Sequence, residues 1–169
     1  MLAKTLHDSL FELKDKGYKI SNGMYVSCDE WEDVFDDDSI AAATIVDHDK
    51  KEIPKMYFNT PSYFYKKGLP FAIRDVSDYQ NQNAKIDLFH EFAHFWQATK
   101  DRSNYFKLCS TNFDDKAKDE IKKHLTVYAT ANKAEFVAEY FAYKTAGKEI
   151  NSPMLEHLYK QCKGPVTEE

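Results

Sequence analysis

His90, Glu91 and His94 are the residues whose types and spacing point most directly to chemistry. They form the pattern His-Glu-x-x-His in a predicted helix over 83–99, whose apolar residues cover most of its circumference. Residues four apart lie one turn apart on the same helical face, so both imidazoles can point at one ion. Such an ion can lower the pKa of a bound water to about 7, and Glu91 is placed to accept the proton. The motif predicts a hydrolytic site with one Zn²⁺ per chain.

A buried polar cluster that binds no ion is the competing interpretation of the same motif. With 6 His in 169 residues, chance produces this pattern in on the order of one in a hundred such chains. The position of the pattern on a buried helix makes an accident less frequent still. We therefore favour zinc binding over a satisfied polar cluster.

A third protein ligand is needed, because catalytic zinc usually takes three protein groups and keeps one position open. The metzincin pattern requires Gly and His where this chain has Gln97 and Lys100, so that class is excluded. Glu135 and Glu139 are the candidates, since they interrupt an otherwise apolar helix predicted over 132–146. The acids and the histidine of the charged segment that precedes this helix are predicted to be solvated: Asp114, Asp115, Asp119, Glu120 and His124.

The helical face that carries Glu135 and Glu139 is otherwise lined with small residues, namely Ala131, Ala138, Ala142 and Ala146. Small residues permit close helix packing, so we expect this face to lie against the zinc helix. One glutamate would then reach the metal, and the other would hydrogen-bond a ligand histidine from behind. The residue pattern does not decide which glutamate takes which role.

The remaining elements are predicted from periodicity and turn residues. An amphipathic helix runs from Leu2 to Leu13 and is ended by Gly17. The other predictions are a hairpin over 18–26, a strand pair over 40–46 and 53–58, an irregular connection over 60–79, and helices over 115–125 and 153–162. Strands first and helices later predict a single α+β domain over 1–169, with a small N-terminal mixed sheet and a helical C-terminal half.

Composition excludes several classes of protein. A net charge of -5 disfavours a nucleic-acid or anionic-membrane partner. Cys28, Cys109 and Cys162 are widely spaced, which indicates free thiols rather than disulfides or a cysteine-ligated zinc. Residues 1–11 lack the continuous apolar stretch of a signal peptide, so localisation stays open between the cytoplasm and secretion after removal of a leader. The acidic segment 29–38 is predicted to be a solvated loop or helix start.

The run Tyr128–Ala142, together with the His90–His94 motif, resembles the family of the anthrax lethal factor catalytic domain and the Pro-Pro endopeptidases. The resemblance spans roughly a third of the chain, from Asp87 to Ala146, and implies a zincin-like fold of the gluzincin type. It implies that Glu135 is the third zinc ligand and that Glu139 supports a ligand histidine.

In that family a tyrosine seven residues before the ligand glutamate stabilises the transition state, and the matching residue is Tyr128. Ala93 stands where relatives often have Gly. The N-terminal half matches nothing in the family, so a substrate cannot be transferred.

These observations predict a monomeric zinc-dependent endopeptidase that cleaves a peptide or protein substrate. Glu91 activates the zinc-bound water, while zinc and Tyr128 stabilise the oxyanion. Extended substrate can pair with strand 40–46 or strand 53–58. One alternative is a non-catalytic binding or structural module on a zincin fold. The other is a deformylase-type hydrolase, which takes a cysteine ligand from an upstream motif; the surroundings of Cys28 do not resemble that motif.

Overall fold

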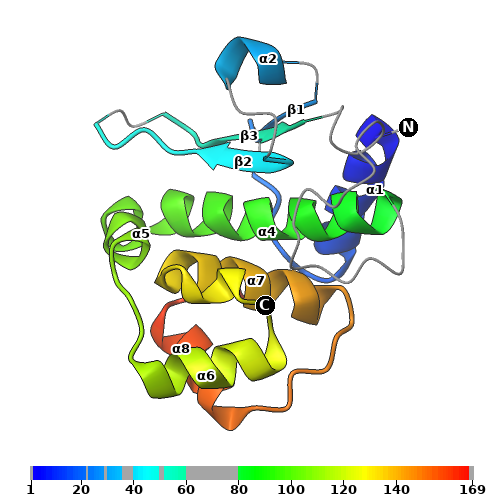
Figure 1. The fold of residues 1–169 in the computed structure, drawn as a ribbon. Coiled ribbons are helices and arrows are strands. Elements are labelled where there is room, and N and C mark those ends of the chain that lie inside the picture. Colours follow the sequence, from blue (N-terminus) through cyan, green and yellow to red (C-terminus); the bar gives the residue numbers. More distant parts are fainter. Residues whose placement is uncertain are drawn as a thin grey trace.

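The structure is a computed structural model that describes residues 2–21, 23–28, 30–35, 40–49, 52–59 and 80–167. The elements, in chain order, are α1 (Leu2–Asp15), β1 (Tyr25–Ser27), α2 (Trp31–Val34), β2 (Ala42–Ile45), β3 (Lys55–Phe58), α4 (Gln80–Lys100), α5 (Arg102–Cys109), α6 (Asp115–His124), the 3-10 turn η1 (Tyr128–Thr130), α7 (Lys133–Thr145) and α8 (Pro153–Gln161). The small sheet lies over α4, α7 lies beneath α4, and α6 and α8 lie further below (Figure 1). The predicted α+β class is confirmed.

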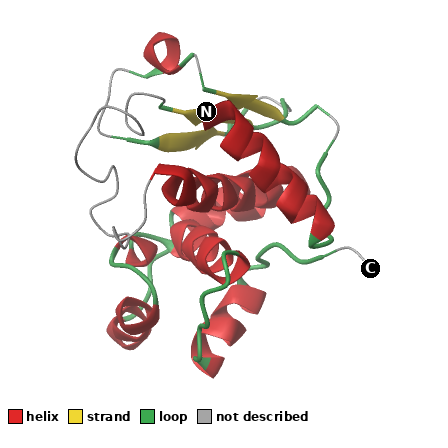
Figure 2. Cartoon of the chain, turned by 90° about the vertical axis from the view of Figure 1, so that its right-hand side faces the viewer, coloured by secondary structure: helices red, strands yellow, loops and turns green. Residues whose placement is uncertain are grey.

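The sheet has three strands in the order β1-β3-β2. β2 and β3 are antiparallel, with Ala42 opposite Phe58 and Ile45 opposite Lys55, so the predicted strand pair is confirmed. The sheet covers one side of the helical layer, and α2 lies on its other face (Figure 2). Trp31 of α2 is 3% exposed and stacks on Phe35, whose ring in turn packs edge-on against Tyr57 of β3.

The predicted hairpin over 18–26 is wrong. β1 pairs in parallel with β3, with Val26 opposite Met56, and residues 18–20 form no strand. Tyr18 instead packs its ring edge-on against Phe141 of α7, at 5.1 Å between centroids. Burial against the helices takes the place of local strand pairing, and Asn22 of the predicted turn lies outside the described residues.

α1 confirms the predicted N-terminal helix. Leu2, Leu6 and Leu13 are buried, and the helix packs along α4. Gly17 follows it with φ of +91°, a left-handed conformation that glycine adopts without steric cost. The helix therefore ends where the glycine signal predicts and covers one side of α4.

α4 lies at the centre of the molecule, between the sheet and α7, and its interior face is aromatic. Leu88, Phe89 and Phe92 are fully buried on it. α6, α7 and α8 confirm the three helices predicted downstream. α5 was not predicted. A single residue, Asp101, separates it from α4, and this residue caps the new helix by accepting a hydrogen bond from the Asn104 N–H at 3.0 Å.

Two predicted segments lie wholly or partly outside the described residues. The irregular connection over 60–79 falls outside them, and of the acidic segment 29–38 only 30–35 is described, which includes α2. Within the described ranges, no helix combines the length and apolar composition that crossing a membrane requires.

Candidate metal centre

The start of α7 brings Glu135 to α4. Asn132 caps the helix, and its side-chain oxygen accepts a hydrogen bond from the Glu135 N–H at 2.9 Å. In a capping box the glutamate at this position reaches back to the cap residue. Here the Glu135 carboxylate instead lies against His90 and His94 of α4. Local sequence thus starts the helix at the point where its first acidic side chain meets the two histidines.

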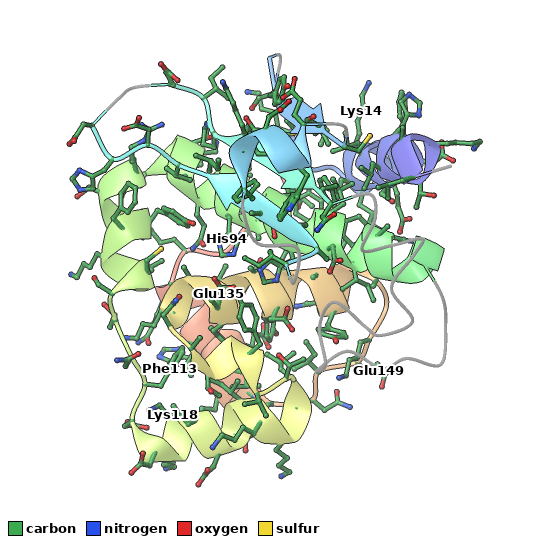
Figure 3. All side chains as sticks on the ribbon, turned by 45° about the horizontal axis from the view of Figure 1, so that its top comes forward. Lys14, His94, Phe113, Lys118, Glu135 and Glu149 are labelled. Atoms are coloured by element: carbon green, nitrogen blue, oxygen red, sulfur yellow. The ribbon has the colours of Figure 1, made fainter. Side chains whose placement is uncertain are left out.

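His90, His94 and Glu135 converge on one point between α4 and α7. The Nε2 atoms of the two histidines are 3.0 Å apart, and Glu135 Oε2 lies 3.1 Å from the first and 3.4 Å from the second. Tetrahedral zinc with bonds of 2.0–2.1 Å separates its ligand atoms by about 3.4 Å. These spacings fit three ligands of a single ion, and Figure 3 shows His94 and Glu135 facing each other from the two helices.

The protons in this cluster also fit a cation. His90 Nδ1 lies 2.9 Å from Glu139 Oε1, and because a carboxylate only accepts, this nitrogen carries the proton. When His90 is neutral, as a metal-binding imidazole must be, its Nε2 lone pair faces His94 Nε2 and Glu135 Oε2. Glu135 Oε2 is buried and makes no hydrogen bond with the described residues. Three electron-pair donors that face one another in a buried site need a positive charge between them.

Electrostatics point the same way. Burial opposes a charged imidazole, yet the adjacent carboxylates of Glu135 and Glu139 raise the pKa of His90 to about 10. Burial also opposes a charged carboxylate, yet His94 and His90 hold the pKa of Glu135 well below its usual range. The two carboxylates therefore attract positive charge to the histidines, as a proton or as a metal ion.

Glu139 lies behind His90 and is 0% exposed. Its Oε1 atom faces His90 Nδ1, and its Oε2 atom accepts a hydrogen bond from the Thr126 hydroxyl at 2.9 Å. Thr126 in turn accepts from the Ala129 N–H at 3.1 Å, which ties the turn η1 to the site. The structure thus separates the two glutamates that the residue pattern left undecided: Glu135 reaches the Nε2 atoms and Glu139 supports His90.

Replacing Glu139 with Gln is expected to weaken zinc binding by about 10- to 100-fold. The amide can still accept from His90 Nδ1 and donate to Thr126, so shape is kept and only the negative charge that makes His90 a better ligand is lost. Competition with a chromogenic chelator measures the affinity. Glu149→Gln, at an exposed glutamate, is the matched control; equal affinities in the two variants would contradict this role for Glu139.

Tyr128 and Glu91 flank the cluster on different sides. Tyr128 stands on η1 with its ring 6.0 Å from that of His90 and is 36% exposed. Burial raises the pKa of Tyr128, and the nearby carboxylates of Glu135 and Glu91 raise it further, so the phenol stays protonated and can donate. Glu91 is 5% exposed, and its Oε2 atom accepts a hydrogen bond from the Thr44 hydroxyl at 2.6 Å.

Three residues at the site were missed by sequence reasoning: Thr44, Tyr105 and Thr126. Tyr105 of α5 packs its ring edge-on against His94, with 5.8 Å between centroids, but α5 itself was not predicted. Thr126 lies two residues before the 3-10 turn η1, and the residues around it form no distinctive pattern. Only Thr44 carries a signal, because it is the one polar residue in the run over 41–46.

The charged segment over 114–124 does not join the site. Asp114, Asp115 and Asp119 are exposed, as predicted, and Asp114 caps α6. Glu120 and His124 are half-buried rather than solvated, because Glu120 accepts from the Ser152 hydroxyl at 2.6 Å and lies 3.2 Å from His124. These contacts join α6 to the start of α8.

Comparison with known proteins does not extend this description. No protein-family model, curated protein or solved structure matches the chain. What stands is a mixed α+β fold and, among the described residues, one group of His90, His94 and Glu135 that can hold a metal ion.

Proposed function

We propose that the chain is a zinc-dependent endopeptidase with a zincin-like fold of the gluzincin type, similar to the lethal factor catalytic domain. The observation that carries the proposal is the convergence of His90 Nε2, His94 Nε2 and Glu135 Oε2 within 3.0–3.4 Å of one another. A carboxylate of the type used for general-base catalysis stands on the same helix, next to the first ligand. The resemblance of 87–146 to the lethal factor family supports the same assignment.

Each residue has a role in this proposal. His90, His94 and Glu135 hold the zinc ion, which when bound polarises a scissile carbonyl and lowers the pKa of a water molecule. Glu91 accepts the proton of the attacking water and returns it to the leaving amine. Tyr128, protonated because its pKa is raised, donates a hydrogen bond to the oxygen on which negative charge develops.

Within the described residues the sheet has two edge strands, β1 and β2, and β2 is the edge that we propose for an extended substrate. β3 has a neighbour on each side, whereas in the described part of the chain β2 pairs only with β3. β2 also contacts the helix that carries the motif, through Thr44 and Glu91. A peptide added alongside β2 by main-chain hydrogen bonding would pass over the general base. We therefore propose a peptide or protein chain as the substrate, bound at this edge.

Digestion of a peptide library tests the proposed function. The zinc-loaded chain is expected to cut at a restricted set of sequences, and the same protein after chelation is expected to cut none until zinc is restored. Mass spectrometry of the products identifies the cut bonds. A zinc-loaded chain that cuts no sequence in the library would overturn the peptidase and favour the non-catalytic module.

Replacing Tyr128 with Phe is expected to lower kcat by about 10²- to 10³-fold, the usual loss when one oxyanion donor is removed. The substitution deletes a single hydroxyl from a side chain that is 36% exposed, so zinc content and KM should change little. Steady-state kinetics on a cleaved library peptide measures both. Tyr25→Phe is the matched control, because Tyr25 lies on β1, at the other edge of the sheet, and its hydroxyl donates to Glu30. A Tyr128→Phe enzyme as fast as this control would remove Tyr128 from the mechanism.

A further inference from the structure

Thr44 lies on β2, the strand that packs against the motif helix α4, and its side chain faces that helix. Residues 41–46 read Ala-Ala-Ala-Thr-Ile-Val, so Thr44 is the only polar residue in the run. Strand alternation places Thr44 on the same face as Ala42, which is 5% exposed and belongs to a core cluster with Leu88 of α4. A hydroxyl on this face is taken from water and needs a partner in the protein.

The partner of the Thr44 hydroxyl is Glu91. The oxygen Oγ1 lies 2.6 Å from Glu91 Oε2 and 3.1 Å from the Glu91 carbonyl oxygen. A hydroxyl has one hydrogen, and the shorter contact falls in the range of charge-assisted O–H···O⁻ bonds. The proton therefore goes to the carboxylate. Valine has almost the same shape and would fill this place without a polar group, so packing alone does not account for threonine here.

The contact fixes the orientation of the Glu91 side chain. Glu91 is 5% exposed, and its carboxylate accepts the Thr44 hydroxyl proton at Oε2. Glutamate has several rotatable bonds, and holding it in one geometry costs conformational entropy. The Thr44 hydroxyl supplies that restraint at Oε2, and the other carboxylate oxygen, Oε1, takes no part in this bond.

We propose that Thr44 is a positioning residue for Glu91, and that strand β2 thereby sets the geometry of the general base. This inference rests on the proposed peptidase function. The hydroxyl holds Oε2, so that Oε1 meets the proton of the attacking water. Because β2 is also the edge proposed for substrate pairing, this one strand positions both the substrate and the general base relative to the motif helix.

Two substitutions at Thr44 separate the hydroxyl from the shape of the side chain. Thr44→Val is expected to lower kcat by about 10- to 100-fold, the range for a hydrogen bond to a charged group, with KM within about twofold. Thr44→Ser, which keeps the hydroxyl, should stay within about threefold of the wild-type kcat. Thr111→Val is the matched control, since that hydroxyl donates to the Lys107 carbonyl at 2.6 Å outside the site.

A kinetic double-mutant cycle shows whether Thr44 acts through Glu91. In a Glu91→Gln background, adding Thr44→Val is expected to cause no further loss of kcat, because the base that it positions is gone. Losses that multiply in the double variant would overturn the proposal. So would a Thr44→Val enzyme with wild-type kcat, or one that loses activity only through KM, which would assign Thr44 to substrate binding.

A second cycle needs no catalysis. Midpoints of denaturant unfolding for Thr44→Val, Glu91→Ala and the double variant are expected to be non-additive, since the two side chains share one hydrogen bond. Additive midpoints would mean that the contact is absent and would overturn the proposal even in an active enzyme. A wild-type chain that cleaves no peptide would overturn the proposed function and the positioning role with it. A wild-type chain that cleaves peptides, together with a Thr44→Val variant of unchanged kcat, would overturn only the positioning role.

Discussion

Replacing Glu91 with Gln is expected to lower kcat for peptide cleavage by about 10²- to 10⁴-fold while leaving one zinc ion bound per chain. Glutamine has almost the same size and still offers an oxygen to the Thr44 hydroxyl, which lies 2.6 Å from Glu91 Oε2. An amide takes up no proton at neutral pH, so the attacking water loses its base. The proposed metal ligands His90 and His94 keep their own contacts, and the variant should therefore separate catalysis from metal binding.

The measurement pairs kinetics with metal analysis. A fluorogenic peptide chosen from the library digest gives kcat, and elemental analysis of the same preparation gives the zinc content. Glu149→Gln makes the same chemical change at an exposed position and should match the wild type in both. Cleavage at the wild-type rate by the Glu91→Gln protein would show that Glu91 is not the general base, whatever the metal content.

The two helices of the site were predictable because their patterns are local. The apolar circumference of α4 and the single polar stripe of His90, Glu91 and His94 require only a helical period to be recognised. The alanine face of α7 likewise indicates close packing. Periodicity alone left Glu135 and Glu139 equivalent, because residues one turn apart share a face.

The distinction between the two glutamates comes from how the helices meet. Glu135 lies at the start of α7 and reaches both Nε2 atoms, whereas Glu139, one turn further on, reaches the opposite nitrogen of His90. The resemblance to the lethal factor family implied this assignment. The periodicity of the sequence does not show how two helices pack against each other, so it could not decide which glutamate reaches the Nε2 atoms.

The contacts that the sheet makes with distant parts of the chain were not predictable. Thr44 and Glu91 are 47 residues apart, and their pairing depends on β2 packing against α4. The parallel pairing of β1 with β3 was missed for a related reason: the turn signal favoured a local hairpin, whereas burial of Tyr18 against α7 removed one of its two strands. Local patterns predict the candidate ligands of this site, and tertiary contacts show which residues lie against them.

Zinc is expected to stabilise the folded chain strongly, and Glu135→Gln is expected to abolish that effect. A ligand that binds only the native state at 1,000 times its Kd adds about 4 kcal/mol to the free energy of unfolding. For a domain of this size that corresponds to a rise in Tm of roughly 8–16 °C. The increase tests the metal site without any assumption about catalysis.

The physical reason lies in the charge of the ligand set. Glu135 supplies the only negative charge among the three proposed ligand residues. Burial opposes that charge, but His94 and His90 outweigh it and hold the pKa of Glu135 well below its usual range, so the carboxylate is ionised at neutral pH. Glutamine preserves the shape, but its neutral amide oxygen is a poor ligand for zinc. The variant should therefore lose both the rise in Tm and peptide cleavage.

Thermal unfolding with and without added zinc gives the comparison, with Glu149→Gln as the control that keeps the full rise. Glu139→Gln should fall between them, because a 10- to 100-fold weaker site loses about 1.4–2.7 kcal/mol of the stabilisation. This ordering distinguishes a ligand from its support: a Glu139 variant that lost the whole effect, with Glu135→Gln unaffected, would reverse the two assignments. Equal rises in all three proteins would place zinc binding elsewhere on the chain.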